Sequence, residues 1–210
     1  MSTEETSFKT KGEIGSFFPD IKEKPWKEPD PKLHDYTDEW FKWYHTRANG
    51  ADNVFVSDIT EPPIYFVQNM PFESPYFKRV TIKERASLLI PIYWFSASRE
   101  EYPSLKGEPE LLELMKKDLS GLNWTDLKAT TLDRKSLPCY CVIRQKPLTI
   151  KGIPPNNPIK VVNKTIHVYH GGFWLLIEPD DISPGDHLLY LKGNSKNYEM
   201  EAKILINATY

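Results

Sequence analysis

Three of the five histidines in this sequence, His167, His170 and His187, stand in β-prone segments near its C-terminal end. Two carboxylates, Glu178 and Asp186, lie between them in the chain. Imidazole nitrogens and carboxylate oxygens bind divalent transition metals, and neighbouring antiparallel strands can bring such side chains together. The three histidines are therefore candidate ligands of a metal site completed by a carboxylate.

The order Pro184-Gly185-Asp186-His187 resembles the second motif of cupins, which are metal-dependent jelly-roll enzymes. That motif has one more residue between glycine and histidine, and the His-x-His motif that accompanies it is missing here. His167 and His170 do not replace it, because residues three apart on a strand point to opposite faces. Histidines at strand ends more often cap turns or pack. We therefore expect no cofactor, and a cupin-like enzyme with a divalent transition metal is the alternative.

Other catalytic patterns are incomplete. Cys139 and Cys141 share one face of a predicted strand, where a disulfide between them is geometrically poor and two thiolates are too few for a structural zinc site. We expect both thiols to be buried and inert. The sequence contains no glycine-rich phosphate loop, no Gly-x-Ser-x-Gly elbow and no His-Glu-x-x-His motif. These observations leave enzymatic activity uncertain.

Aromatic residues form the second group of candidates, since the chain has six tryptophans and eleven tyrosines. Trp40, Trp43 and Tyr44 fall on one face of a helix predicted over residues 36–49. Such a stripe usually packs against a core, and the alternative is a platform on which a ligand ring stacks. The candidate ligand-binding aromatics are Trp40, Trp43, Tyr44 and, in an apolar strand near the C-terminus, Trp174.

A polar loop is predicted from Ser96 to Pro103, directly after an apolar strand. Loops in this position often carry functional residues. Arg99 and Glu101 are the further candidates for ligand binding, although a solvated charged loop explains the same residues.

Short strands must position all of these side chains. Within residues 165–193, Gly171-Gly172 predicts a turn, Phe173–Ile177 a buried strand and Ser183–Asp186 a second turn. Pro91 predicts an edge position or a bulge, because proline cannot donate to a strand ladder. The other predicted strands are Val54–Val56, Pro63–Asn69, Val80–Ile82, Ser87–Trp94, Asn123–Leu132, Cys139–Arg144, His187–Leu191 and Tyr198–Ala208.

Two helices accompany the strands. The first is expected to begin at Thr37 as N-cap and to close at Asn49-Gly50. The second is predicted over Pro109–Leu119, and Asp133-Arg134 is typical of a hairpin turn. The pattern predicts a mainly β fold, an antiparallel β-sandwich of jelly-roll or immunoglobulin-like type with two short helices.

The order Gly-Phe-Trp-Leu-Leu-Ile-x-Pro, then Ser-Pro-Gly-Asp-His, then Leu-Lys-Gly resembles the C-terminal half of a group of uncharacterised bacterial and archaeal β-rich proteins. The segment Val80–Ile92 is similar to the middle of those proteins. The resemblance spans roughly residues 64–206 and supports the β-rich fold. The group has no known activity, so the resemblance implies none for this chain.

Composition limits the classes of function. The chain has 210 residues with 27 Lys and Arg against 29 Asp and Glu, a net charge of −2. This balance argues against general nucleic-acid binding. The sequence lacks a membrane-spanning apolar run and the apolar core of a signal peptide, which predicts a soluble, cytoplasmic protein unless a leader was removed. Residues 1–35 read as an extended or partly disordered arm and residues 36–210 as one domain.

The sequence favours a non-catalytic ligand-binding or assembly module, because catalytic constellations are incomplete while aromatic residues are abundant. Its expected partner is a small molecule or glycan, or a second subunit contacted through the arm, which carries Phe17, Phe18 and Trp26. Neither nucleic acid nor membrane is expected as a partner.

Overall fold

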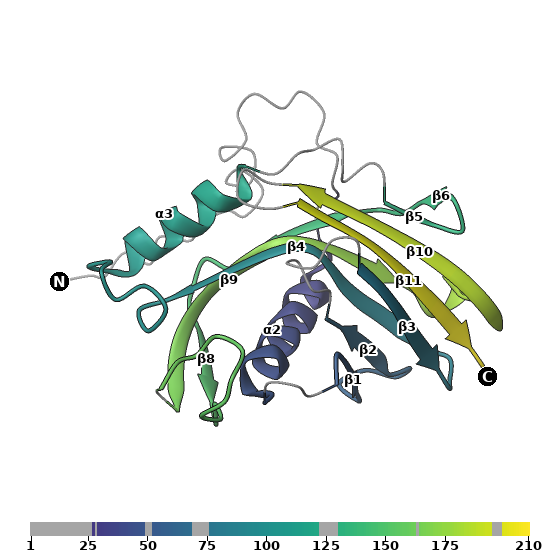
Figure 1. Ribbon diagram of the computed structural model, residues 1–210, viewed down its shortest axis with the longest axis horizontal. Coiled ribbons are helices and arrows are strands. Elements are labelled where there is room, and N and C mark those ends of the chain that lie inside the picture. The colour runs from purple at the N-terminus through teal and green to yellow at the C-terminus, as the bar shows by residue number, and fades with distance from the viewer. Residues whose placement is uncertain are drawn as a thin grey trace.

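The computed structural model describes residues 27, 29–48, 52–68, 76–121, 130–162, 164–194 and 199–210. The described residues form two β-sheets and two α-helices, arranged in layers (Figure 1). The prediction of a mainly β fold with two helices, compatible with a β-sandwich, is confirmed. Phe17, Phe18 and Trp26 lie outside the described residues. The first helix ends at Thr46, with Arg47 already extended, so the end expected at Asn49-Gly50 is wrong.

The larger sheet has six strands in the order β1-β2-β4-β9-β7, with β8 also paired to β9. Its central strands β4 and β9 pair from Leu88 opposite Ile177 to Ser98 opposite Val168. The register shifts between Pro91 and Tyr93, so of the two alternatives that Pro91 predicts the bulge is confirmed, whereas the edge position is wrong because β4 is central. The strands are β1 (Val54–Ser57), β2 (Ile64–Val67), β4 (Ser87–Ser98), β7 (Tyr140–Ile143), β8 (Leu148–Lys151) and β9 (Thr165–Ile177).

The smaller sheet has five strands in the order β3-β11-β10-β5-β6. Strands β10 and β11 pair over ten positions. Strands β5 and β6 form a hairpin, which confirms the turn predicted at Asp133-Arg134, and both turn residues have positive φ. The predicted strand over Asn123–Leu132 is observed only at its end, since residues 122–129 lie outside the description. The strands are β3 (Tyr76–Ile82), β5 (Thr131–Leu132), β6 (Lys135–Ser136), β10 (Gly185–Asn194) and β11 (Glu199–Ala208).

Both sheets are mixed, whereas the sequence predicts antiparallel pairing throughout. Strand β2 runs parallel to β4, and β3 runs parallel to β11. The first of these pairs arises because β3, which lies between β2 and β4 in the chain, belongs to the other sheet. The chain therefore returns to the larger sheet in its original direction, as a crossover connection requires.

Strand β9 runs without interruption through Gly171 and Gly172, so the turn predicted at this glycine pair is wrong. A Cβ atom on Gly172 would lie 2.5 Å from the Tyr93 carbonyl oxygen, and one on Gly171 would lie 3.0 Å from a Leu119 methyl carbon. The two glycines are thus needed for close approach by β4 and by the second helix rather than for a positive φ.

Helix α2 (Pro31–Thr46) packs on the face of the larger sheet that points away from the smaller sheet (Figure 1). The helix begins at Pro31 rather than after Thr37, because Asp30 caps it by accepting a 3.0 Å hydrogen bond from the Lys32 amide. Five residues assigned to the arm are therefore helical, and Leu33 among them is buried. Before the helix, the Lys27 amide donates to the Cys139 carbonyl at 2.7 Å, which ties this part of the chain to the domain.

Helix α3 (Glu108–Leu119) matches its prediction to within one residue. It packs against β4 and β9 on the side of the larger sheet that also faces the smaller sheet, with Leu111, Met115 and Leu119 buried. In Figure 1 it covers the end of β9 that the smaller sheet does not reach. Within the described chain, no helix covers the outer face of the smaller sheet, and none is long and apolar enough to cross a membrane.

Candidate functional site

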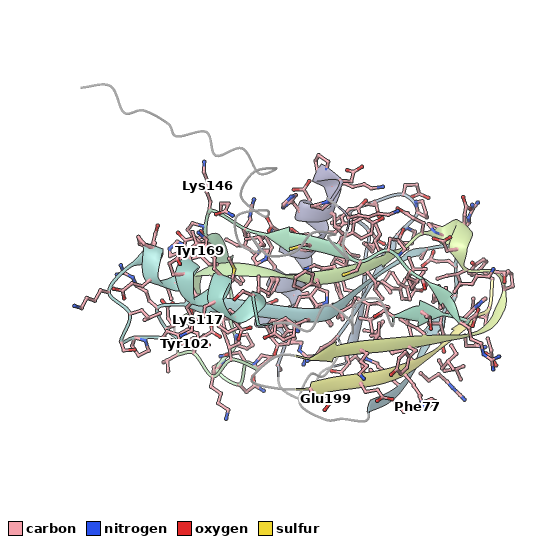
Figure 2. All side chains as sticks on the ribbon, turned by 90° about the horizontal axis from the view of Figure 1, so that it is seen from above. Phe77, Tyr102, Lys117, Lys146, Tyr169 and Glu199 are labelled. Atoms are coloured by element: carbon pink, nitrogen blue, oxygen red, sulfur yellow. The ribbon has the colours of Figure 1, made fainter. Side chains whose placement is uncertain are left out.

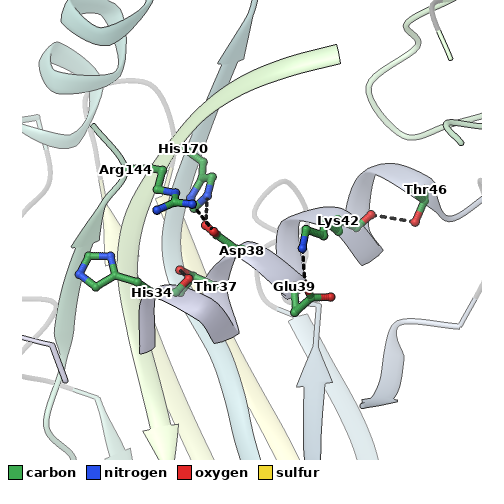
Figure 3. Close-up of polar contacts among 8 residues, drawn as sticks. All are labelled: His34, Thr37, Asp38, Glu39, Lys42, Thr46, Arg144 and His170. Carbon is green, nitrogen blue, oxygen red and sulfur yellow. Dashed lines mark hydrogen bonds and ion pairs between the residues drawn. The ribbon is translucent and has the colours of Figure 1, made fainter. Parts of the chain in front are cut away.

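A cluster of polar side chains joins α2 to the larger sheet. The Asp38 carboxylate on α2 lies 2.9 Å from Nε2 of His170 on β9 and 2.6 Å from a guanidinium nitrogen of Arg144, just beyond β7. Figure 3 shows the Asp38 carboxylate pointing from the helix toward both partners. The His170 side chain is fully buried, and the Asp38 side chain is nearly so. Arg144 reaches the surface and supplies the charge opposite the carboxylate.

Helical spacing explains why Asp38 faces the sheet. Asp38, Phe41 and His45 are three and four residues apart, so they line one side of α2. The Phe41 ring stacks on the His170 ring with centroids 4.1 Å apart. His45 donates from Nδ1 to the Phe41 carbonyl at 2.8 Å and is itself fully buried. Two imidazoles thus lie within one buried helix–sheet contact.

Burial keeps both imidazoles neutral. It lowers the pKa of His45 to about 4, against a smaller opposing effect of the hydrogen bond to Phe41. It also lowers the pKa of His170, although the contact with Asp38 acts in the other direction. His45 Nε2 and His170 Nδ1 have no hydrogen-bond partner among the described residues. Because both rings are closed to solvent, this cluster fastens α2 to β9 and gives a substrate no direct access.

The candidate aromatic residues are mostly internal. Trp40 and Trp174 are fully buried with ring centroids 5.2 Å apart, and Tyr44 stacks on Trp40 at the same distance. Their rings contact protein neighbours, so the exposed platform that would place them against a ligand is not formed. Trp43 differs, because it is half-buried and its ring stacks on that of Phe55 at the surface.

The polar loop begins later than predicted, because Ser96 to Ser98 continue strand β4. Arg99 is exposed and donates to the Lys106 carbonyl at 3.4 Å. Glu101 instead turns inward and lies 3.0 Å from the Ser98 hydroxyl. Burial raises the pKa of Glu101 to about 7, while its hydrogen bonds with Ser98 oppose that shift. Arg99 therefore faces solvent, whereas Glu101 turns toward the protein interior.

The three candidate metal ligands occupy separate places. His167 is exposed and contacts Thr149, whereas His170 contacts Asp38 and His187 contacts Asp133. The two carboxylates considered with them have other partners: Glu178 pairs with Lys32, and Asp186 accepts from Asn207. Among the described residues, no group of three His, Cys, Asp or Glu side chains could hold a metal ion. Cys139 and Cys141 are free and buried, as expected, and burial raises the pKa of the Cys139 thiol.

A groove of about 460 Å³ opens beside the β5–β6 hairpin. Thr131, Asp133, Arg134, Leu188 and Tyr190 line it. It brings together an aromatic ring, an exposed aliphatic side chain, a guanidinium group and hydroxyl groups. This combination suits a ligand with one apolar face and polar substituents.

The wall of this groove is fixed by paired side chains. The Leu188 amide donates to Asp133 at 2.8 Å. His187 contacts Asp133 through Nδ1 and the Ser183 carbonyl through Nε2, at 2.7 Å each. Burial would lower the pKa of His187, but these two hydrogen bonds outweigh it and raise the pKa. His187 therefore supports the hairpin as a protonated donor.

The groove continues onto the outer face of the smaller sheet. On each strand the residues that point toward the larger sheet are buried, as Leu189, Leu191, Ile204 and Ile206 are. Their neighbours point outward because side chains alternate along a strand. The outward residues of β3, β11 and β10 are Phe77, Arg79, Thr81, Glu199, Glu201, Lys203, Leu205, Asn207, Asp186, Leu188, Tyr190 and Lys192.

Sequence reasoning missed Asp38, Arg144 and most of the residues at the groove. The spacing of Asp38 with Phe41 and His45 could have placed Asp38 on the buried face, but its position near the helix start suggests only a favourable interaction with the helix dipole. The groove depends on which strands become neighbours, and no local pattern contains that information.

No protein-family model matches this sequence, and comparison with curated proteins and with solved structures gave no match either. The resemblance to the β-rich group therefore stays a prediction, and function has to be inferred from the sites themselves.

Proposed function

We propose that this protein is a non-catalytic binding module whose ligand site is the groove beside the β5–β6 hairpin. The observation that carries this proposal is the lining of the groove by Tyr190, Leu188 and Arg134 over a continuous sheet. An aromatic ring and an aliphatic side chain cover the apolar face of a sugar or similar ring, and a guanidinium group binds its oxygens.

The rigidity of the site supports a binding role. Strands β10 and β11 pair over ten positions beneath the groove, and Asp133 holds the hairpin through His187 and the Leu188 amide. A site formed before the ligand arrives loses little conformational entropy on binding. The module would therefore bind without a large rearrangement of its backbone.

The placement of the titratable groups supports binding rather than catalysis. In the groove, the Asp133 carboxylate is already engaged by His187 and by a backbone amide. The other His–carboxylate pair, Asp38 and His170, lies inside the helix–sheet contact. A general base has to reach the proton that it removes and be free to accept it. Asp38 and His170 are closed to solvent, and Asp133 already accepts hydrogen bonds from His187 and the Leu188 amide.

A glycan array tests the proposal, because it presents neutral and acidic oligosaccharides together. We expect the wild-type chain to bind at least one glycan class, and Tyr190→Ala and Arg134→Ala to weaken that binding about tenfold or more. Phe55→Ala and Lys151→Ala are matched controls, since both side chains are exposed on the larger sheet, and they should bind as the wild type does. Binding by neither the wild type nor any variant, or equal binding by all of them, would contradict the proposal.

A further inference from the structure

One row of outward side chains crosses the smaller sheet into the groove. Phe77 on β3 is opposite Lys203 on β11, Lys203 is opposite Tyr190 on β10, and Tyr190 is opposite Thr131 on β5. Phe77 is 64% exposed and, in Figure 2, lies at the margin of the molecule beside the smaller sheet. The row therefore presents a ring, an ammonium group and a second ring in succession.

A second row runs beside the first. Arg79 on β3 is opposite Leu205 on β11, which is opposite Leu188 on β10. Arg79 is exposed, and Leu188 is 45% exposed. Each row thus combines apolar surface with one cation, and Arg134 adds a third cation where the rows meet the hairpin.

Carboxylates on this face are already engaged or lie at its ends. Asp186 accepts a 2.6 Å hydrogen bond from Asn207, and Asp133 is held by His187. Glu201 stands opposite Lys192 and Glu199 opposite Asn194 in the register, near the far end of the β10–β11 pair. The centre of the face, between the two rings, is therefore positively charged.

We propose that the outer face of the smaller sheet binds an acidic glycan, a chain of sugar rings that carries carboxylate groups and crosses the strands from Phe77 to the groove. Because this rests on the proposed function, it names the ligand class of the same site. The sugar rings stack on Phe77 and Tyr190, and a carboxylate between them pairs with Lys203.

Strand spacing fits this arrangement. Neighbouring strands lie about 4.8 Å apart, so Phe77 and Tyr190, two strands from each other, are separated by roughly 10 Å. A disaccharide unit spans such a distance, which places the ring of each sugar near one aromatic side chain and its acidic group near the cation between them. Hydrogen bonds between an ammonium or guanidinium group and a carboxylate are stronger than neutral ones, so Lys203 and Arg79 would select acidic over neutral chains.

The charge distribution favours a glycan over a nucleic acid. A single-stranded nucleic acid needs a continuous basic track for its phosphates. This face carries Asp186, Glu201 and Asp133 among its cations, and the whole chain has a net charge of −2. The cations on this face are isolated from one another. Carboxylates spaced along a sugar chain match this spacing better than the phosphates of a nucleic acid, which occur at every nucleotide.

Calorimetric titration with oligogalacturonate, and with the same oligomer methyl-esterified to remove its charge, tests the inference on the full chain. We expect the free acid to bind about tenfold or more tightly than the ester, and this preference to shrink when the salt concentration rises. Lys203→Gln should weaken binding of the acid about tenfold and leave the ester almost unaffected. Phe77→Ala should weaken both ligands, whereas Lys151→Gln and Phe55→Ala should change neither.

The outcomes separate the two proposals. Equal binding of acid and ester would overturn the acidic-glycan inference and leave the binding module standing. Failure of every glycan to bind would overturn both. Tighter binding of an oligothymidylate probe than of the acidic glycan would overturn the inference in favour of single-stranded nucleic acid. The comparison of acid with ester uses wild-type protein, so it remains decisive even if a variant fails to fold.

Discussion

The Asp38 carboxylate of α2 lies 2.9 Å from Nε2 of His170 at the centre of the larger sheet, and this contact fixes the helix on the sheet. The contact is buried, and Asp38 is also the partner of Arg144. Removing the carboxylate would therefore leave a buried imidazole and a half-buried guanidinium group without their acceptor. Asp38 therefore adds a polar contact to the apolar packing of Leu33, Trp40 and Phe41 that also holds α2 on the sheet.

We expect Asp38→Ala to lower the free energy of unfolding by about 3 kcal/mol, because breaking a buried pair on one side leaves the other groups uncompensated. Urea denaturation followed by tryptophan fluorescence measures this change. Glu39→Ala is the matched control, since Glu39 is the adjacent carboxylate and pairs only with Lys42 near the surface; it should change stability by less than about 0.5 kcal/mol. Similar losses in both variants would show that the Asp38 contact does not hold the helix.

His45 should make the fold sensitive to mild acid. Its pKa is about 4 in the folded protein and about 6.5 when unfolded, so the unfolded chain gains this proton first as the pH falls. The neutral ring therefore makes its full contribution to the free energy of unfolding above about pH 6.5. This contribution declines toward pH 4, by up to about 3 kcal/mol. His170 acts in the same direction.

Replacement of the ring isolates this contribution. We expect His45→Phe to lose less stability than the wild type between about pH 7.5 and pH 5, with a difference of about 2 kcal/mol in urea denaturation. Parallel curves of stability against pH for the two proteins would contradict the burial of a neutral His45. Titrating groups away from this cluster are common to both proteins, so they cancel in the comparison.

Glu101 should have the opposite dependence on pH. Its folded pKa of about 7 is above the ordinary value of 4.5, so the folded protein holds the proton over this window. The stability of the wild type therefore falls as the pH rises from about 4.5 through 7. Glu101→Gln removes the charge, so this variant should be more stable than the wild type by about 2 kcal/mol near pH 8 and no more stable near pH 4. Thermal unfolding at both pH values measures this. Glu100→Gln is the control, and an equal gain there would point to a general charge effect.

Gly172 should tolerate no side chain. An alanine Cβ would lie 2.5 Å from the Tyr93 carbonyl oxygen and 3.0 Å from Trp94 Cα, both backbone atoms of the bulged strand β4. We expect Gly172→Ala to cost about 3 kcal/mol or to prevent folding. At Gly107 the nearest atom is 3.5 Å away, so Gly107→Ala should cost under about 1 kcal/mol. Circular dichroism and thermal melting of both variants decide the point, and a normal melt for Gly172→Ala would refute the close approach.

Local patterns predicted the local elements well. Helix α3 is recognisable from its apolar stripe and Pro109, and the Asp133-Arg134 turn and the Pro91 bulge follow from backbone preferences. The start of α2 was missed because proline-rich residues before Tyr36 suggest an extended chain, although Asp30 and Pro31 form a helix cap. Gly171-Gly172 was misread because the same residue type serves turns and close packing.

The sites were harder to predict because they depend on non-local pairing. The row of Phe77, Lys203 and Tyr190 is created by a parallel pairing of β3 with β11, which no periodicity within either strand reveals. The contact of Asp38 with His170 likewise joins elements from opposite parts of the chain. The burial of Trp40 and Trp174 agrees with the usual packing of such residues in a core rather than with the alternative of a ligand platform.

The contact between α2 and β9 also has a consequence for synthesis in the cell. Asp38 and His170 are 132 positions apart, so the helix emerges from the ribosome long before the strand that receives it. Until that strand is translated, the apolar side of α2, including Trp40 and Phe41, has no partner sheet in its final form. The nascent chain would consequently need protection by chaperones or by transient contacts during this interval, and folding should be completed late in translation rather than element by element.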